Sequence, residues 1–151
     1  MVSERTSEEP MGAPRPAASV ESASDGQEIE LRLPGTATHV PVVRALAADL
    51  AARLDFDLDQ ISDLRMAVDE VCADLVATIL PAERLTCVFR AEKDTLWVTA
   101  SAVTRTGAVP PRTTFGWRVL TALVDEVDSW ADADQTVFVR LGKHRLSGFS
   151  A

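Results

Sequence analysis

Apolar and polar residues alternate in the first patterned segment of the chain, residues 28–33. Its apolar members are Ile29, Leu31 and Leu33. An alternation with a period of two is typical of a strand with one buried face, and Pro34-Gly35 predicts where it ends. The patterned part of the chain is therefore expected to open with a strand.

Two stretches follow in which apolar residues recur every three or four positions, the spacing of an amphipathic helix. The first runs from about His39 to Leu54, and the second ends before Pro81. The expected caps are Thr36 or Thr38 for the first helix and Asp57 or Asp59 for the second. The expected apolar stripe of the second helix is Leu58, Ile61, Leu64, Val68, Val71, Leu75 and Ile79.

The second half of the chain predicts three more strands and one more helix. A hairpin is expected from Arg84–Arg90 and Thr95–Ala102, joined by a polar loop of four residues, Ala91 to Asp94. Residues 103–114 predict a loop, since they contain one Gly and two Pro and no apolar period. A helix from Phe115 to about Trp130 and a strand from Gln135 to Leu141 complete the pattern. The order of elements predicts an α+β fold, a two-layer sandwich with a mainly antiparallel sheet and three helices on one face.

Residues 1–26 differ from the rest in composition, being rich in Ser, Glu, Pro and Ala and lacking aromatic residues. Such a segment buries too little apolar surface to offset the entropy of ordering, so we expect a disordered acidic tail. Residues 27–143 have the length of one domain, and residues 144–151 are expected to form a short C-terminal tail.

Charge and hydropathy narrow the classes of function. The formal net charge is −8, whereas a nucleic-acid surface needs clustered Lys and Arg, so direct nucleic-acid binding is not expected. The sequence has no apolar run of about 18 residues, so no membrane span is expected, and its acidic N-terminus does not resemble a signal peptide. We therefore expect a cytoplasmic protein in which Cys72 and Cys87 are reduced, buried thiols.

Two acidic residues lie one helical turn apart in AVDEVCADLVATIL, residues 67–80. Glu70 and Asp74 would share one side of the second helix, where like charges repel by a few tenths of a kcal/mol. A solvated acidic face is the ordinary explanation. The alternative is a site in which these carboxylates meet a metal ion or a proton.

Two further motifs are DLRMAVDEVCADLV, residues 63–76, and FGWRVLTALVDEVD, residues 115–128. The first is similar to the N-box helix and the second to the G2 box of RsbW-type anti-sigma factors and serine-protein kinases, which belong to the GHKL (Bergerat) ATPase superfamily. Arg44 aligns with an arginine that family members use to bind partners. Each feature is weak alone, but their order and spacing across residues 27–143 indicate the family.

The resemblance implies a role for each position. Glu70 stands where the family has its general base, and Asp74 replaces an asparagine that coordinates the Mg²⁺ of bound ATP. A carboxylate is also a hard oxygen ligand for Mg²⁺, so Asp74 is a candidate metal and cofactor ligand. Gly116 matches the second glycine of the G2 box, a cofactor-binding position. Arg44 would contact protein partners.

The nucleotide motifs also depart from the family pattern. Ala102 stands in place of the aspartate that reads the adenine amino group, and Thr104 in place of a glycine. Phe115 is expected to put a bulky ring where the backbone should approach phosphate. Arg105 and Arg112 in the lid-like loop could contact phosphate. ATP and Mg²⁺ are thus implied by the resemblance, while the residues predict a degraded nucleotide cradle.

Two functions follow from the resemblance. The first is a homodimeric anti-sigma factor that sequesters a stress or stationary-phase sigma factor through its first strand and helix and is released by a STAS-type anti-anti-sigma protein. The alternative is an active ATP-dependent serine kinase that phosphorylates the anti-anti-sigma protein. A scaffold with an unrelated partner stays open, because a fold does not dictate function. The degraded cradle favours the first function.

Overall fold

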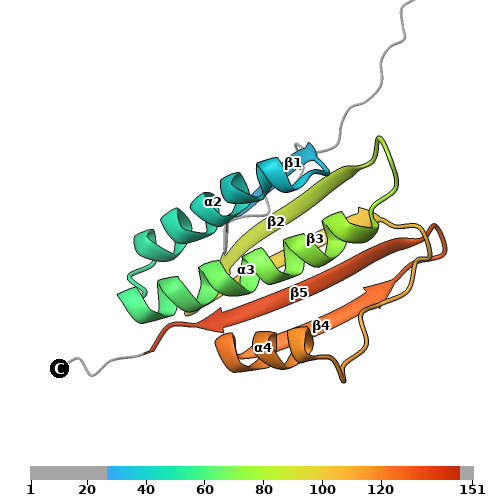
Figure 1. Cartoon of the computed structure of the whole chain (residues 1–151). Coiled ribbons are helices and arrows are strands. Elements are labelled where there is room, and N and C mark those ends of the chain that lie inside the picture. Colours follow the sequence, from blue (N-terminus) through green and yellow to red (C-terminus); the bar gives the residue numbers. More distant parts are fainter. Residues whose placement is uncertain (1–26, 147–151) are drawn as a thin grey trace, which may run out of the picture.

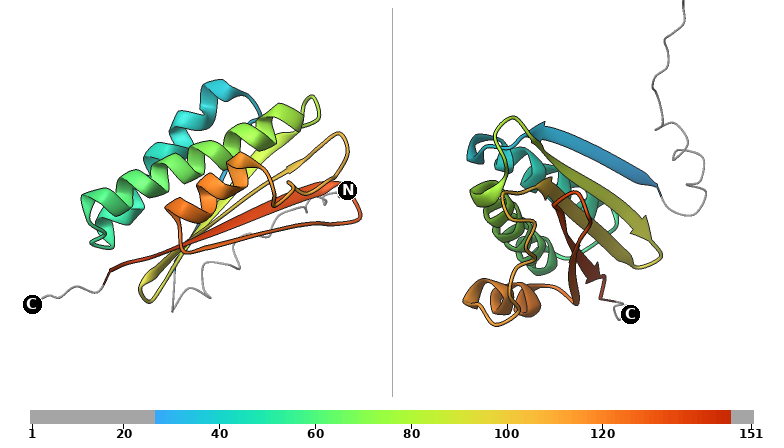
Figure 2. Two further views of the ribbon diagram at one scale, coloured as in Figure 1. Left: turned by 60° about the horizontal axis from the view of Figure 1, so that its bottom comes forward. Right: turned by 90° about the vertical axis from the view of Figure 1, so that its right-hand side faces the viewer.

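An antiparallel sheet of five strands forms one layer of the structure and three α-helices form the other (Figure 1). The computed structural model describes residues 27–146, so the expected N-terminal tail and residues 147–151 lie outside the described residues. All three α-helices cover the same face of the sheet (Figure 2). The expected α+β two-layer sandwich is confirmed.

The sheet has the strand order β1-β2-β3-β5-β4. In chain order the elements are β1 (Glu28–Pro34), the 3-10 helix η3 (Ala37–His39), α2 (Val40–Arg53), α3 (Leu58–Thr78), β2 (Arg84–Glu92), β3 (Thr95–Val103), α4 (Phe115–Leu123), β4 (Glu126–Ala131) and β5 (Thr136–His144). The last strand therefore includes one residue beyond the expected domain end at 143. None of the helices in the described part of the chain is long and apolar enough to cross a membrane.

The core lies between the two layers and is built from alternate strand residues. Register places Leu33 opposite Leu85, and Val98 opposite Leu141, so these inward side chains form rows across the sheet. Each of these four side chains is buried. The helices complete the core mainly through α3, whose fully or nearly fully buried apolar residues are Leu64, Ala67, Val68, Val71, Cys72 and Leu75.

β4 shows that the expectation of a helix reaching about residue 130 is wrong. α4 ends at Leu123, and Val124 already has extended backbone (φ −129°, ψ 171°). Lys143 of β5 donates from Nζ to the Leu123 carbonyl at 2.7 Å. Asp125 N donates to the Gly142 carbonyl at 3.0 Å. β5 thus supplies hydrogen-bond partners at the end of the helix, and the chain continues alongside it as an edge strand.

The ends of the first two α-helices differ in how well they were predicted. Asp57 caps α3 as expected, since its Oδ1 accepts from Gln60 N at 2.8 Å in a capping box. The cap of α2 is His39, and neither threonine caps that helix through a side-chain hydrogen bond. The Thr36 hydroxyl instead lies 3.0 Å from His39 Nδ1. Leu58, expected in the apolar stripe of α3, is 83% exposed.

The β2–β3 hairpin is tighter than expected. Its strands run to Glu92 and from Thr95, so the loop has the two residues Lys93-Asp94 rather than four. Lys93 has a φ of 55°, the left-handed backbone that two-residue hairpin loops favour. Arg145, just after β5, pairs with Asp94 of this loop at 2.7 Å.

The second face of the sheet carries no helix of the described chain (Figure 2). It holds a cluster of three aromatic side chains and one arginine: Trp97, Trp130, Phe138 and Arg140. We call the surface formed by these four residues the open sheet face. The Trp130 and Phe138 rings stack with centroids 5.3 Å apart. The Arg140 guanidinium lies 4.8 Å from the centroid of the Trp97 ring. A layer of aromatic surface is therefore left available on the side opposite the helices.

Candidate functional site

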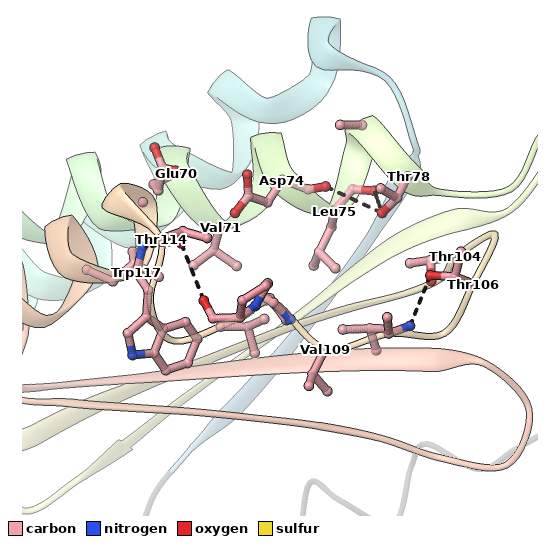
Figure 3. A pocket seen from close by; sticks show the side chains of 18 residues that line it. Glu70, Val71, Asp74, Leu75, Thr78, Thr104, Thr106, Val109, Thr114 and Trp117 are labelled. Atoms are coloured by element: carbon pink, nitrogen blue, oxygen red, sulfur yellow. Dashed lines mark hydrogen bonds between the residues drawn. The ribbon is translucent and has the colours of Figure 1, made fainter.

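A cavity of about 500 Å³ lies between α3, the loop of residues 104–114 and α4 (Figure 3). Its apolar lining includes residues from both layers: Val71, Leu75, Val109, Trp117, Leu120, Val137 and Val139. Three threonine side chains, Thr78, Thr104 and Thr106, line the end nearest the C-terminus of α3. The charged residues among the lining are Glu70 and Asp74, and both are acidic.

Glu70 and Gly116 lie against each other where α3 meets the first turn of α4. A Cβ added at Gly116 would be only 2.6 Å from Glu70 Oε2. Glycine is therefore the residue that leaves room for this carboxylate. The two positions, 46 residues apart by their numbers in the sequence, were predicted separately from the two motifs, and the fold brings them together in the lining of the cavity.

Asp74 follows one turn further along α3, and its side chain extends toward the cavity (Figure 3). Partial burial raises the pKa of this carboxyl above its ordinary value of 3.8, because the charged form loses water. Its carboxylate is one oxygen donor that a Mg²⁺ ion could use. Among the described residues, however, no group of three or more His, Cys, Asp or Glu side chains is placed to hold a metal ion.

Arg105 does not face the cavity as a free cation. Its Nη2 donates to the Ala77 carbonyl at 3.2 Å and its backbone N–H donates to the Thr78 carbonyl at 2.9 Å. Arg105 thus satisfies carbonyls at the C-terminus of α3, which an α-helix otherwise leaves without partners. Gln135 adds a bond from Nε2 to the Arg105 carbonyl at 3.0 Å, so the start of the loop is tied to the β4–β5 turn as well.

Arg112 is also engaged with protein groups. Its Nη2 lies 3.1 Å from Asp128 Oδ1, and its guanidinium carbon lies 4.7 Å from the centroid of the Trp117 ring. The backbone N–H of Ser129 and the Arg112 guanidinium together lower the pKa of Asp128. Both loop arginines, considered above as phosphate contacts, therefore stabilise the loop.

The position that was expected to read adenine lies outside the cavity. Ala102 is 3% exposed and does not belong to the cavity lining. Thr104 does line the cavity, but its hydroxyl accepts a hydrogen bond from Gly107 N at 2.9 Å and so holds the loop. Phe115 is 80% exposed and is not part of the lining, so the expectation that its ring blocks a phosphate position is wrong.

These residues do not fit a nucleoside triphosphate. The cavity offers two carboxylates and no Lys, Arg or His, so the phosphates would meet like charges without a protein cation to offset them. The space beside Gly116, where a phosphate could approach the backbone, already holds the Glu70 carboxylate. Asp74 could share a Mg²⁺ ion with water and phosphate oxygens, but the rest of the cradle is missing.

Arg44 belongs to a different surface. It lies on α2 and its Nη1 is 2.8 Å from Asp69 Oδ2 on α3, with side chains 33% and 37% exposed. Asp69 Oδ1 is buried without a hydrogen-bond partner. The sequence did not predict this ion pair, because helical spacing gives no register between two different helices. The candidate partner contact thus pairs with Asp69, the residue directly before the candidate catalytic residue Glu70, although Arg44 itself does not line the cavity.

The two cysteines lie in the core, as expected. Cys72 is 1% and Cys87 is 0% exposed, and both are free thiols. Contact with Cys87 and burial raise the pKa of the Cys72 thiol.

No family model matches the chain. Two groups of relatives are nevertheless similar to it in sequence. The chain is 37% identical over 107 residues to the anti-sigma-F factor RsbW of Mycobacterium tuberculosis, a match that covers 71% of this chain and 64% of the relative. It is 30% identical over 77 residues to the serine-protein kinase RsbW of Bacillus cereus, covering 50% of this chain and 48% of the relative. The chain thus spans less than two thirds of the length of the relatives it matches.

The fold has a solved counterpart. A crystal structure of the RsbU and RsbW domains of Rv1364c from Mycobacterium tuberculosis superposes with a TM-score of 0.63 at 18% identity. The match covers 82% of this chain and 34% of that one. At this identity the likeness establishes the fold alone and leaves the activity to be argued from the site.

Proposed function

Because the chain is a homologue of RsbW-type anti-sigma factors and serine-protein kinases, we propose that it is an anti-sigma factor. It sequesters an alternative sigma factor of the stress or stationary-phase class and is released when a STAS-domain anti-anti-sigma protein captures it. The observation that carries this choice over the kinase is the cavity, whose charged lining residues are both acidic. We place the protein in the cytoplasm, where these partners act.

The sigma-binding surface includes Arg44 on α2. Its guanidinium is one-third exposed and held at a fixed position by Asp69, so it is presented to a partner with little further ordering. Met66, one helical turn before Asp69 on α3, is 53% exposed and adds apolar surface on that helix. A charged anchor together with apolar surface is typical of a protein interface.

Binding of purified sigma factors to the full chain tests this proposal. Arg44→Ala should weaken the complex about tenfold or more, which corresponds to about 1.4 kcal/mol. Arg53→Ala is the matched control, because Arg53 also lies on α2 and also pairs with an aspartate, Asp49, at 2.7 Å, but on an exposed surface. If neither a sigma factor nor a STAS-domain protein from the same organism binds the wild-type chain, the proposal is wrong.

A homodimer is part of the same proposal. The open sheet face supports it, since an aromatic cluster without helix cover is a surface that a second copy can bury. The flanking strands carry both signs of charge, with Arg32 and Arg90 beside Glu30 and Glu92. A two-fold axis can therefore place opposite charges against each other. Sedimentation equilibrium of the full chain, compared with Trp130→Glu, tests this: the wild type should be a dimer and the variant a monomer.

The serine kinase is the second candidate, and the placement of Glu70 beside Gly116 favours it. A general base at the position of Glu70 would lie at the end of the cavity next to α4. Transfer of labelled phosphate from Mg-ATP to a STAS-domain protein, abolished by Glu70→Ala, would establish this activity. The acidic lining predicts that no transfer is seen.

A further inference from the structure

We infer that Glu70 determines which ligands the cavity accepts, by acting as an internal anion at the first turn of α4 and thereby excluding other anions. The inference concerns the cavity alone and does not depend on which protein partner binds elsewhere. It gives Glu70 a positioning and specificity role in place of a catalytic one.

The carboxylate of Glu70 lies against the first turn of α4. Oε2 of Glu70 lies 2.6 Å from the position that a Cβ of Gly116 would take, and the next side-chain atom outside Glu70, Thr114 Oγ1, is 4.0 Å from that position. The carboxylate therefore fills the space beside the backbone of Gly116. Any larger residue at 116 would displace it.

The N-terminal end of α4 favours a nearby negative charge. The first turn of α4 contains no acidic residue of its own. Its cap, Thr114, accepts from Trp117 N at 3.1 Å, whereas the N–H groups of the first helical residues have no partner within the helix. These groups carry a partial positive charge that stabilises a nearby anion. Glu70 supplies that anion from α3.

An anionic ligand in the cavity would meet the Glu70 carboxylate. A phosphate group approaching the same turn would have to share the position with a carboxylate and would also face Asp74 one turn away. Arg105 and Arg112, the cations of the neighbouring loop, are held by the Ala77 carbonyl and by Asp128. The remaining lining side chains are apolar or, like those of the threonines, uncharged. The cavity therefore favours neutral or cationic groups with an apolar body over polyanions.

Calorimetric titration of the full chain with inorganic tripolyphosphate, and separately with Mg-ATP, tests the inference. Glu70→Ala and the nearly isosteric Glu70→Gln should bind tripolyphosphate about tenfold or more tightly than the wild type does, because the internal anion is gone. Asp74→Asn is the control, since it removes one negative charge from the same lining without touching α4, and it should change the affinity by less than half as much on a logarithmic scale.

An equal or lower affinity in both Glu70 variants overturns the inference, and so does an equal gain in Asp74→Asn, which would assign the effect to the net charge of the cavity. A gain of anion affinity is not a result that damaged folding produces. If Glu70→Ala does not fold, as judged by far-UV circular dichroism, Glu70→Gln carries the test. Sigma-factor binding measured on the same samples keeps a failure here distinct from a failure of the proposed function.

Discussion

Replacing Gly142 by alanine should destabilise the protein by about 2 kcal/mol, because the Trp97 ring lies where the new methyl group would go. Gly142 is paired with Trp97 across β3 and β5. A Cβ at this position would lie 2.6 Å from Cζ3, 2.9 Å from Cε3 and 3.0 Å from Cη2 of that ring. Carbon atoms in good contact are about 3.5–4.0 Å apart, so the ring would have to move by about 1 Å.

The magnitude follows from two losses. Overpacking of this kind costs about 1–3 kcal/mol. Moving the ring also weakens its contact with the Arg140 guanidinium, 4.8 Å from its centroid, which at a partly exposed site is worth about 0.5–1 kcal/mol. Urea unfolding, followed by tryptophan fluorescence and far-UV circular dichroism, measures the free energy of unfolding. The melting temperature should fall by about 6 °C for a domain of this size.

A double-mutant cycle decides whether Trp97 is the cause. In a Trp97→Leu background the same Gly142→Ala substitution should cost less than about 0.5 kcal/mol, because the clash is gone and alanine restricts the unfolded chain. If Gly142→Ala costs as much in that background as in the wild type, or costs nothing in the wild type, then the packing described for the open sheet face is incorrect.

Three further predictions concern the site and the core. Thr114→Ala removes the cap of α4 to Trp117 N and should cost about 1 kcal/mol in thermal unfolding; an unchanged melting temperature would show that the cap is not needed. Burial raises the pKa of Asp74 in the folded state above 3.8. Below pH 3.8 the protonated carboxyl therefore contributes to the stability of the fold, and this contribution is lost as the pH rises through the raised pKa. Asp74→Asn should therefore be more stable than the wild type at pH 7, with a gain that shrinks as the solution is acidified, and a gain that is independent of pH would contradict this. Cys72 and Cys87 should not react with a thiol reagent such as DTNB until the protein is unfolded, since both are fully buried; rapid reaction in native buffer would mean that the core opens.

Helices and strands that show a clear apolar periodicity could be predicted from the sequence. At β4 this periodicity predicts the wrong element. Val124 and Val127 continue the three-to-four spacing of α4, and no Gly or Pro interrupts the segment. The helix nevertheless stops because Lys143 bonds the Leu123 carbonyl and because β5 offers an edge for pairing. These partners lie about 20 residues further along the chain, so the periodicity of the segment itself cannot reveal them.

In the candidate site, too, some positions could be predicted from the sequence, whereas contacts between separate elements could not. The positions of Glu70, Asp74 and Gly116 in one cavity followed from motifs whose spacing is fixed by the fold. The ion pair of Arg44 with Asp69 and the engagement of Arg105 with Ala77 depend on how separate elements pack, and neither has a sequence signal. The exposed position of Phe115 is another case, since a residue at the first position of a helix can point either way.

The proposed anti-sigma function requires a complex with a sigma factor, and the acidic cavity predicts that this complex forms without nucleotide. The most direct test is the dissociation constant of the complex between the full chain and its sigma factor, measured with and without saturating Mg-ATP. The complex should form in both conditions, with the same dissociation constant. A complex that forms only with Mg-ATP present, or no complex in either condition, would contradict it.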